Sequence, residues 1–401
     1  MLLKFLLGTF LALPVLVGAA YSQAGASPGE EGPTSGPTIG KAGEGSYAVQ
    51  LGFYNHADGA GDGNPFLDED LTVIEPILIY DYNVTDRLSL GAELAYDNVS
   101  SASIERLSKF PEQSGASQDN YLGVDLSLNY QKTKDWTLGT HAGYSVEYDY
   151  RSTGLGFNAT QNLPNANAKL SYSFDAYLDT IDVIRFNGHG EGSESRTSLN
   201  GTVNWYQVLS PTSHGNFGVT LASQTGFLET AYNAVVVEDG SMPGNTNLDN
   251  LANGFEVTEE LPDSRFRAAF FGRVRNSINR KSAYELGGRL YGDSWGISSV
   301  AFEPRYYRSL IEGKLDWRLR YRFYTQTEAD DFGEHFTTAF ASDEDYRTQD
   351  SDLAAFDAHT LGTKWTWTLG AGSSWDFNLD YTLRSDGLDQ FFGSVGWRHS
   401  Y

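Results

Sequence analysis

Arginine occupies alternate positions within residues 315–326, LDWRLRYRFYTQ. In a β-strand this period of two would place Arg318, Arg320 and Arg322 on one face with Asp316, and leucine and aromatic side chains on the other. Guanidinium groups bind carboxylates and phosphates through paired N–H donors. The stretch therefore predicts a strand with an apolar face and a face that is able to attract anions.

Arginine also marks the polar face of three preceding segments. The full set of candidates for an anion path is Arg265, Arg267, Arg273, Arg275, Arg289, Arg305, Arg318, Arg320 and Arg322. If the apolar faces meet lipid, these side chains must point into an enclosed lumen, because a lipid-facing arginine costs about 2–4 kcal/mol near the bilayer midplane. Two interpretations remain open: an electropositive wall, or internal ion pairs that leave little net field. The acids for such pairs are Glu285, Asp293, Glu303 and Asp316.

Sixteen segments of alternating polarity are available to position this wall. Each is about 10–14 residues long, which suits a tilted membrane-spanning strand. The predicted strands are residues 46–56, 71–82, 87–97, 119–131, 135–148, 152–162, 167–178, 197–210, 215–229, 264–276, 282–293, 296–309, 314–327, 358–369, 373–384 and 389–401.

The connections between these segments favour a barrel. Short joints alternate with longer ones at about 57–70, 98–118, 179–196, 230–263 and 328–357. One rim of turns and one rim of loops is typical of up-and-down membrane barrels. We therefore expect an all-β fold, a transmembrane up-and-down antiparallel β-barrel of about 16 strands. A soluble all-β protein is the alternative, but it would not explain an apolar face on nearly every strand.

The start of the sequence predicts export. Residues 1–24 contain Lys4, an apolar run and then small residues, a pattern typical of a signal peptide cleaved after Ala20 or Ala24. The apolar run is shorter than the roughly 20 residues that a spanning helix needs. Residues 25–45 are rich in Gly, Pro and Ser and predict a flexible segment. The barrel would then occupy residues 46–401.

The end of the sequence, SVGWRHSY, resembles the C-terminal assembly signal of bacterial outer-membrane proteins. Its defining positions are Ser394, Gly396, His399 and Tyr401. His399 departs mildly from the pattern, which usually has a larger aromatic or apolar residue there. We expect the barrel-assembly machinery to fold the chain into the bacterial outer membrane, where outer-membrane lipid and lipopolysaccharide would surround it.

Composition limits the chemistry. The net charge of −24 argues against a nucleic-acid partner, because polyanions would be repelled. The chain has no cysteine, which removes disulfides, thiol nucleophiles and thiolate metal sites. Acidic residues are concentrated in 57–70 and 328–357, which we interpret as solvated surface rather than a calcium site. The seven histidines show no metal-binding spacing, and we predict no metal, no cofactor and no enzymatic activity. His141 and Ser145 would lie roughly 13 Å apart along one strand, too far for direct contact.

Several blocks resemble a family of Gram-negative exported proteins named domain of unknown function 3570. They are TVIEPILIYDY (72–82), NWYQVLSP (204–211), EELPDSRFR (259–267), YELGGRLYGDSWGISS (284–299) and RLRYRFYTQTEADDF (318–332). The resemblance runs from about residue 70 to the C-terminus. It implies an outer-membrane β-barrel and brings no substrate or catalytic residue.

These observations favour a porin-like channel for passive diffusion of small hydrophilic solutes, with an arginine wall that biases passage of anions. A barrel of this width cannot fill its interior with strand side chains alone. The alternative is a non-conducting barrel that acts as a receptor, a scaffold or a sleeve of a periplasm-to-surface complex. The sequence does not indicate the oligomeric state.

Overall fold

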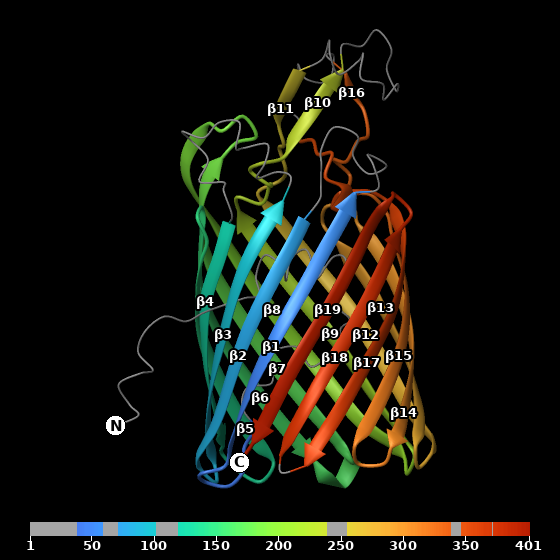
Figure 1. The fold of residues 1–401 in the computed structure, drawn as a ribbon. Helices are drawn as coiled ribbons and strands as arrows, with labels where there is room; N and C mark the ends of the chain where they lie inside the picture. The colour runs from blue at the N-terminus through green and yellow to red at the C-terminus, as the bar shows by residue number, and fades with distance from the viewer. Residues whose placement is uncertain (1–37, 59–70, 102–118, 239–254, 338–345, 371) are drawn as a thin grey trace.

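The computed structural model describes residues 38–58, 71–101, 119–238, 255–337, 346–370 and 372–401. Sixteen antiparallel strands close into one barrel (Figure 1). Each coincides with a segment predicted from the alternation, so the predicted fold class is confirmed. The signal peptide and most of residues 25–45 lie outside the described residues. No helix in the described ranges is long and apolar enough to cross a membrane.

The barrel strands follow the chain in order around the wall. The first eight are β1 (Gly45–Asp58), β2 (Leu71–Thr85), β3 (Leu88–Ser101), β4 (Asp119–Gln131), β5 (Trp136–Val146), β6 (Tyr150–Leu163), β7 (Ala168–Ile184) and β8 (Gly190–Ser210). The others are β9 (Ser213–Gly226), β12 (Ser264–Asn279), β13 (Ser282–Asp293), β14 (Ser298–Ile311), β15 (Leu315–Gln326), β17 (Phe356–Gly370), β18 (Ser373–Arg384) and β19 (Leu388–Ser400).

Pairing of the first and last barrel strands closes the wall. The β1–β19 register runs from Ser46 opposite Ser400 to Asp58 opposite Leu388. Beyond it, Gly45 N donates to Tyr401 O at 3.0 Å, and Tyr401 N donates to Gly45 O at 2.9 Å. The closed ring therefore leaves no unpaired sheet edge, which removes a common site of aggregation.

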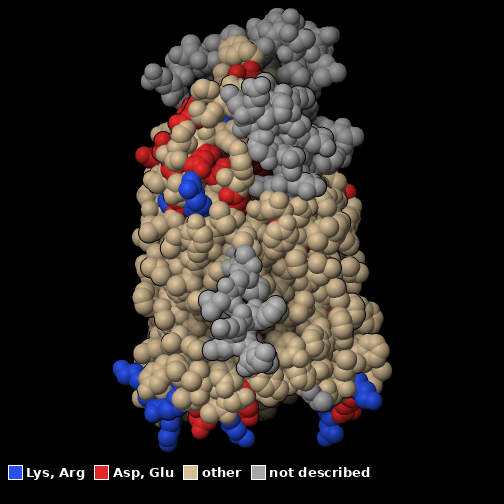
Figure 2. Space-filling model, turned by 60° about the vertical axis from the view of Figure 1, so that its left-hand side comes forward, with Lys and Arg blue, Asp and Glu red and all other residues tan. Residues whose placement is uncertain are grey.

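The two faces of the barrel have opposite chemistry. Large apolar side chains are exposed on the outside, for example Phe157, Leu361 and Leu126. In Figure 2 a broad middle band carries almost no charged side chain among the described residues in view, with basic and acidic groups together below it and mainly acidic groups above. A lipid-facing band between two polar rims is what a bilayer requires of a β-barrel.

The two rims differ in their connections. We call the rim where β1 begins the turn end and the opposite rim the loop end (Figure 1). At the turn end the joints are short, and one contains the 3₁₀ turn η1 (Pro164–Ala166). Three joints at the loop end are also short, at residues 147–149, 294–297 and 385–387. Long and short joints therefore alternate only partly.

The expectation of a long joint at 179–196 is wrong. β7 continues to Ile184 and β8 begins at Gly190, so the joint spans only residues 185–189. The added part of β8 is polar on both faces, with the sequence GEGSES, whereas the added part of β7 includes Ile181, Val183 and Ile184. Two strands can pair without alternating polarity where neither face meets lipid. The alternation that predicted the two strands therefore ends before the strands themselves do.

A structured cap stands at the loop end, and the sequence analysis did not predict it. It contains a small sheet of β10 (Ala234–Glu238), β11 (Phe255–Thr258) and β16 (Phe336–Thr337). It also contains the 3₁₀ turn η3 (Ser351–Leu353). We use "cap" for the described residues 227–238, 255–263, 327–337 and 346–355. The short apolar run AVVV in β10 was the available signal.

Candidate functional site: the barrel lumen

The strand register places all nine predicted arginines on the lumen side. Directly opposed residues in antiparallel strands share a face. Arg275 is opposite Glu285, Glu285 is opposite Arg305, and Arg305 is opposite Arg320. We call the lumen face of β12–β15, which carries the nine arginines, the basic wall.

Four arginines of the basic wall form ion pairs. Arg320 Nη2 lies 2.9 Å from Asp380 Oδ1 on β18. Arg273 and Arg305 each approach Glu285 at 3.6 Å, and Arg305 also pairs with Glu303. The interpretation as internal ion pairs therefore applies to this part of the wall. Such pairs brace neighbouring strands and cancel much of the local field.

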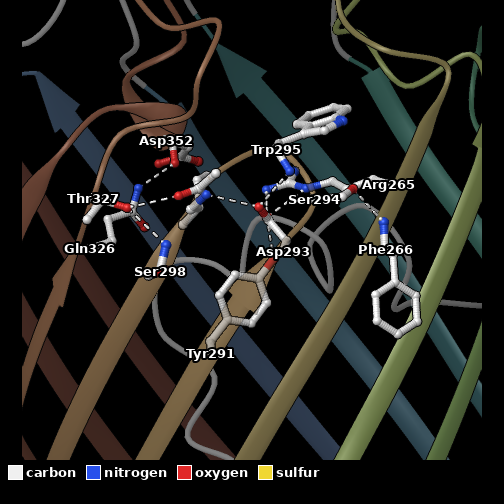
Figure 3. A network of polar contacts seen from close by, with 12 residues as sticks. Arg265, Phe266, Tyr291, Asp293, Ser294, Trp295, Ser298, Gln326, Thr327 and Asp352 are labelled. Carbon is white, nitrogen blue, oxygen red and sulfur yellow. Dashed lines mark hydrogen bonds and ion pairs between the residues drawn. The ribbon is translucent and has the colours of Figure 1, made fainter.

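The fourth ion-paired arginine, Arg265, lies at the loop end and is the centre of a polar network (Figure 3). Arg265 Nε donates to Asp293 Oδ2 at 2.9 Å, and Tyr291 OH donates to the same oxygen at 2.7 Å. The Arg265 guanidinium also lies 4.1 Å from the ring centroid of Trp295. Nearby, Gln326 Nε2 donates to Asp352 O at 3.0 Å. The network joins three barrel strands to the cap.

Three arginines make no ion pair with the described residues: Arg267, Arg275 and Arg289, which we call the unpaired arginines. Arg275 lies over the Tyr307 ring at 3.7 Å, and Arg289 lies 5.9 Å from the Tyr291 ring. Nε of Arg267 and of Arg289 is buried and makes no hydrogen bond to a described residue. An aromatic face orients a guanidinium without neutralising it. The positive charges of these side chains therefore face the lumen without a neutralising carboxylate among the described residues.

The last two predicted arginines have polar or aromatic contacts. Arg318 Nη2 donates to Asn378 Oδ1 at 3.1 Å, and the Arg322 guanidinium lies 4.9 Å from the Tyr324 ring centroid. Tyr324 OH in turn donates to Gln326 Oε1 at 2.7 Å. Arg322 is therefore linked through Tyr324 to the residues that hold the cap.

A cavity of about 960 Å³ opens in the turn-end half of the lumen. Basic side chains outnumber acidic ones around it. The basic residues are Arg273, Arg275, Arg280, Lys281, Arg305, Arg308, Arg318, Lys364 and Arg398, and the acids are Glu285, Asp316 and Asp376. Five of these basic residues were not among the predicted candidates: Arg280, Lys281, Arg308, Lys364 and Arg398. Lys364 and Arg398 could have been found, because each lies beside an aromatic residue in its own strand.

The opposite side of the lumen is acidic. Strands β2, β3, β4 and β7 direct carboxylates inward, and we call this set the acidic wall. Its members are Glu75, Asp81, Glu93, Asp97, Asp125, Asp175 and Asp179. Within β2–β7 the single arginine, Arg151, faces outward and pairs with Asp182 at 2.7 Å. None of these seven acids was among the residues predicted to line the lumen.

Glycine shapes the acidic wall. His141 Nε2 lies 3.4 Å from Asp175 Oδ1, and the two strands that carry them are separated by β6. Gly156 of β6 lies between them, where a Cβ atom would stand 2.1 Å from His141 Nε2. The absence of a side chain at Gly156 lets His141 cross β6. His141 is therefore paired with Asp175, and Ser145 lies farther along the same strand, as the spacing predicted.

Two carboxyl groups are buried where the cap segments meet. Glu259 accepts hydrogen bonds from Thr230 N at 2.7 Å and from Thr348 Oγ1 at 2.6 Å. Burial, and then the charge of Asp350, raise the pKa of Glu259 to about 8. Burial also raises the pKa of Asp350. The cap therefore holds titratable groups that are protonated more readily than ordinary carboxyls.

The predicted assembly signal occupies the turn end of β19. Ser394 and Gly396 line the turn-end cavity, whereas Tyr401 lies on the outer face and is half exposed. Tyr401 OH is 3.1 Å from Tyr80 OH, and His399 Nδ1 is 2.8 Å from Ser373 Oγ. These contacts tie the chain end to β18 and, beyond β1, to β2, which suits a segment that completes the barrel.

The acidic loops offer no metal site within the described residues, where no group of three or more His, Asp or Glu side chains is placed to hold a metal ion. Most of residues 57–70, and residues 338–345 within 328–357, lie outside the described ranges. The prediction of a solvated acidic surface there stays a prediction.

The family described as "Protein of unknown function (DUF3570)" matches residues 108–396. The match confirms the resemblance noted in the sequence blocks. No curated protein matches the chain.

Several solved outer-membrane proteins share the barrel shape at low identity. The CymD monoaromatic hydrocarbon channel is 10% identical with a TM-score of 0.41, over 90% of this chain and 89% of that one. A bacterial polysaccharide outer membrane secretin is 8% identical with a TM-score of 0.48, over 88% and 98%. OccK1 (OpdK) from Pseudomonas aeruginosa is 9% identical with a TM-score of 0.42, over 90% and 100%. Likeness at this level carries no functional information.

Proposed function

Because the chain belongs to the DUF3570 family, whose description assigns no function, we propose a function from the lumen itself: an outer-membrane channel for passive diffusion of small hydrophilic solutes, with the basic wall favouring anions. The turn-end cavity of about 960 Å³, lined mainly by basic side chains, carries this proposal. A lumen-lining ring of charge selects ions by attraction at close range.

The unpaired arginines are the residues that we expect to act on anions. Arg275 lines the turn-end cavity, and Arg289 borders two smaller spaces farther along the lumen. Arg267 continues the series toward the loop end. The ion-paired arginines, by contrast, have carboxylates that compete with a solute. We infer that anion preference depends on the unpaired set more than on the total number of arginines.

Planar-bilayer recording of the refolded barrel under a KCl gradient tests the proposal. The wild-type protein should give open-channel steps with a reversal potential on the anion-selective side. The variant Arg267→Gln/Arg275→Gln/Arg289→Gln should lose that preference while conductance persists. The matched control is Arg320→Gln/Asp380→Asn, which removes an ion pair without changing net charge and should leave selectivity unchanged.

Folding of each variant is checked by the mobility difference between heated and unheated samples on detergent gels, a property of stable membrane barrels. A silent bilayer from folded wild-type protein would contradict the channel proposal.

The alternative of a non-conducting receptor, scaffold or sleeve has one observation in its favour. The cap is bound to the barrel strands by defined contacts, including Arg384 Nη2 of β18 to Ser351 O at 2.9 Å. A surface structure fixed to the barrel is suited to a partner. Deletion of residues 228–260 separates the two functions: a channel should conduct at least as well, whereas a receptor should lose its partner.

A further inference from the structure

The acidic wall contains four adjacent carboxylates whose neighbours are also acidic. Glu93 is directly opposite Asp125 across β3 and β4. The register of β2 against β3 sets Glu75 beside Asp97. Like charges in directly opposed positions destabilise a sheet. None of the four forms an ion pair with a Lys or Arg among the described residues, and the basic neighbour of this group is His141, which lies beside Asp125.

The side chain of Asp97 is a second, independent indication of a binding site. Its side chain is 1% exposed, and its Oδ1 accepts no hydrogen bond from a described residue. An ionised carboxylate buried without a donor is costly. A cationic group bound beside Asp97 and Glu75 would supply both charge and hydrogen-bond donors.

Two glycines shape the wall around these carboxylates. Gly52 faces Glu75 across β1 and β2, and a Cβ atom there would stand 3.1 Å from Glu75 Oε2. Gly143 faces Asp125, and a Cβ atom there would stand 3.2 Å from Asp125 Oδ2. The two glycines let the carboxylates lean along the wall, and no side chain from these positions projects over them.

The geometry favours an organic cation over a metal ion. No described group of three or more acidic or histidine side chains is placed to hold a metal. A primary ammonium group needs less exact geometry, since it carries three N–H donors on a freely rotating head. Paired acceptors such as those of Glu75 and Glu93 suit it.

Resting on the proposed channel function, we propose that the acidic wall is a binding site for an ammonium group, and that the preferred solutes are small zwitterions. The ammonium end would bind beside Glu75, Glu93 and Asp97. The carboxylate end would face the unpaired arginines on the other side of the lumen. A solute with both charges gains from both walls, whereas a simple anion or cation gains from one.

Current block with matched solutes tests the inference. The probes are γ-aminobutyrate, a zwitterion, and glutarate, which replaces its ammonium group by a second carboxylate. In wild-type channels γ-aminobutyrate should reduce the KCl current at lower concentration than in Glu75→Gln/Glu93→Gln channels, by about tenfold, the effect of losing one charge-assisted hydrogen bond. Block by glutarate should not weaken in the variant. Glu44→Gln/Glu312→Gln, which changes two exposed acids of the turn end outside the cavity lining, is the matched control and should retain γ-aminobutyrate block.

Calorimetric titration of γ-aminobutyrate into the folded barrel in detergent gives a second measurement that needs no conduction. Binding that is lost in Glu75→Gln/Glu93→Gln would support the site even if the channel proposal fails. Equal block by γ-aminobutyrate in wild type and variant, or no heat of binding to the wild-type barrel, would overturn the inference. Channels that conduct with anion preference but ignore the zwitterion would leave the proposed function standing alone.

Discussion

The two walls of the lumen hold their charges in different ways. On the basic wall, arginines are fixed by carboxylates of adjacent strands or by aromatic rings, as with Arg305 beside Glu285 and Arg275 over Tyr307. On the acidic wall, carboxylates such as Glu93 and Asp125 lie directly beside each other, although His141 and Arg196 pair with two other members of the wall, Asp175 and Asp179. Long guanidinium side chains require a support, whereas short carboxylates are positioned by the strand itself. We therefore predict that substitutions of the ion-paired arginines mainly lower the stability of the barrel, whereas substitutions of the unpaired arginines mainly change its ion selectivity.

Reversal of charge on the basic wall should have the largest effect, because it abolishes the contrast between the walls. Arg267→Glu/Arg275→Glu/Arg289→Glu would leave both walls acidic along much of the lumen. We expect the reversal potential under a KCl gradient to change sign, toward cation selectivity. The same number of reversals at exposed turns, Lys132→Glu/Lys134→Glu/Lys314→Glu, should shift it far less. An unchanged sign in the first variant would mean that these arginines do not face the conducting path.

Substitution of an ion-paired arginine should lower the free energy of unfolding of the barrel more than substitution of an unpaired arginine. Arg305→Gln leaves Glu303 and Glu285 without their partner, and breaking a buried ion pair costs about 3–5 kcal/mol. Arg289→Gln loses only a distant aromatic contact, so its cost should stay within about 1 kcal/mol. Urea unfolding of the barrel in lipid vesicles measures both values. Equal losses would show that stacking supports the wall as strongly as ion pairing.

Replacing glycine by alanine should lower the stability of the barrel on the acidic wall and have little effect on the basic wall. In Gly156→Ala the new Cβ would stand 2.1 Å from His141 Nε2 and 2.6 Å from Asp175 Oδ1, which forces their ion pair apart. Overpacking of this kind costs about 1–3 kcal/mol. Gly287→Ala on the basic wall is the control, since its nearest contact would be Glu303 O at an ordinary 3.4 Å. The same unfolding experiment should show a loss in the first variant and little change in the second.

The smallest effect concerns the cap, which is bound to the basic wall. The pKa of Glu259 is raised to about 8, so closing the cap favours its protonated form. Cap stability should therefore be greatest near pH 4.5, fall as the pH rises toward about 8, and change little above that. The charge of Asp350 acts on Glu259, and the charges of Asp352, Arg384 and Arg265 act on Asp350.

Hydrogen exchange of residues 230–237 and 346–353, corrected for the intrinsic effect of pH, measures this opening. Protection should decline between pH 5 and 8 in the wild type. In Glu259→Gln the decline should be reduced, because the group at 259 no longer titrates. A wild-type cap with constant protection over this range would contradict the assignment.

The barrel was predictable from the sequence because the bilayer imposes a simple rule on each strand. Alternation in segments such as 373–384 reflects one lipid-facing and one lumen-facing side, and all sixteen barrel strands obeyed it. Prediction failed where that rule no longer applies. The extension of β7 and β8 and the cap sheet lie beyond the lipid, where both faces of a strand meet water or protein.

The sequence determined which side chains enter the lumen, since strand parity fixes the face of every residue from Arg265 to Arg322. It left open whether those arginines are neutralised, because that depends on partners contributed by other strands. Asp380, on β18, reaches Arg320 across β17, and no spacing along the chain reveals that contact. The grouping of acids on one wall and unpaired arginines on the other likewise follows from closure of the ring. Local alternation fixes orientation, whereas charge balance is a property of the closed barrel.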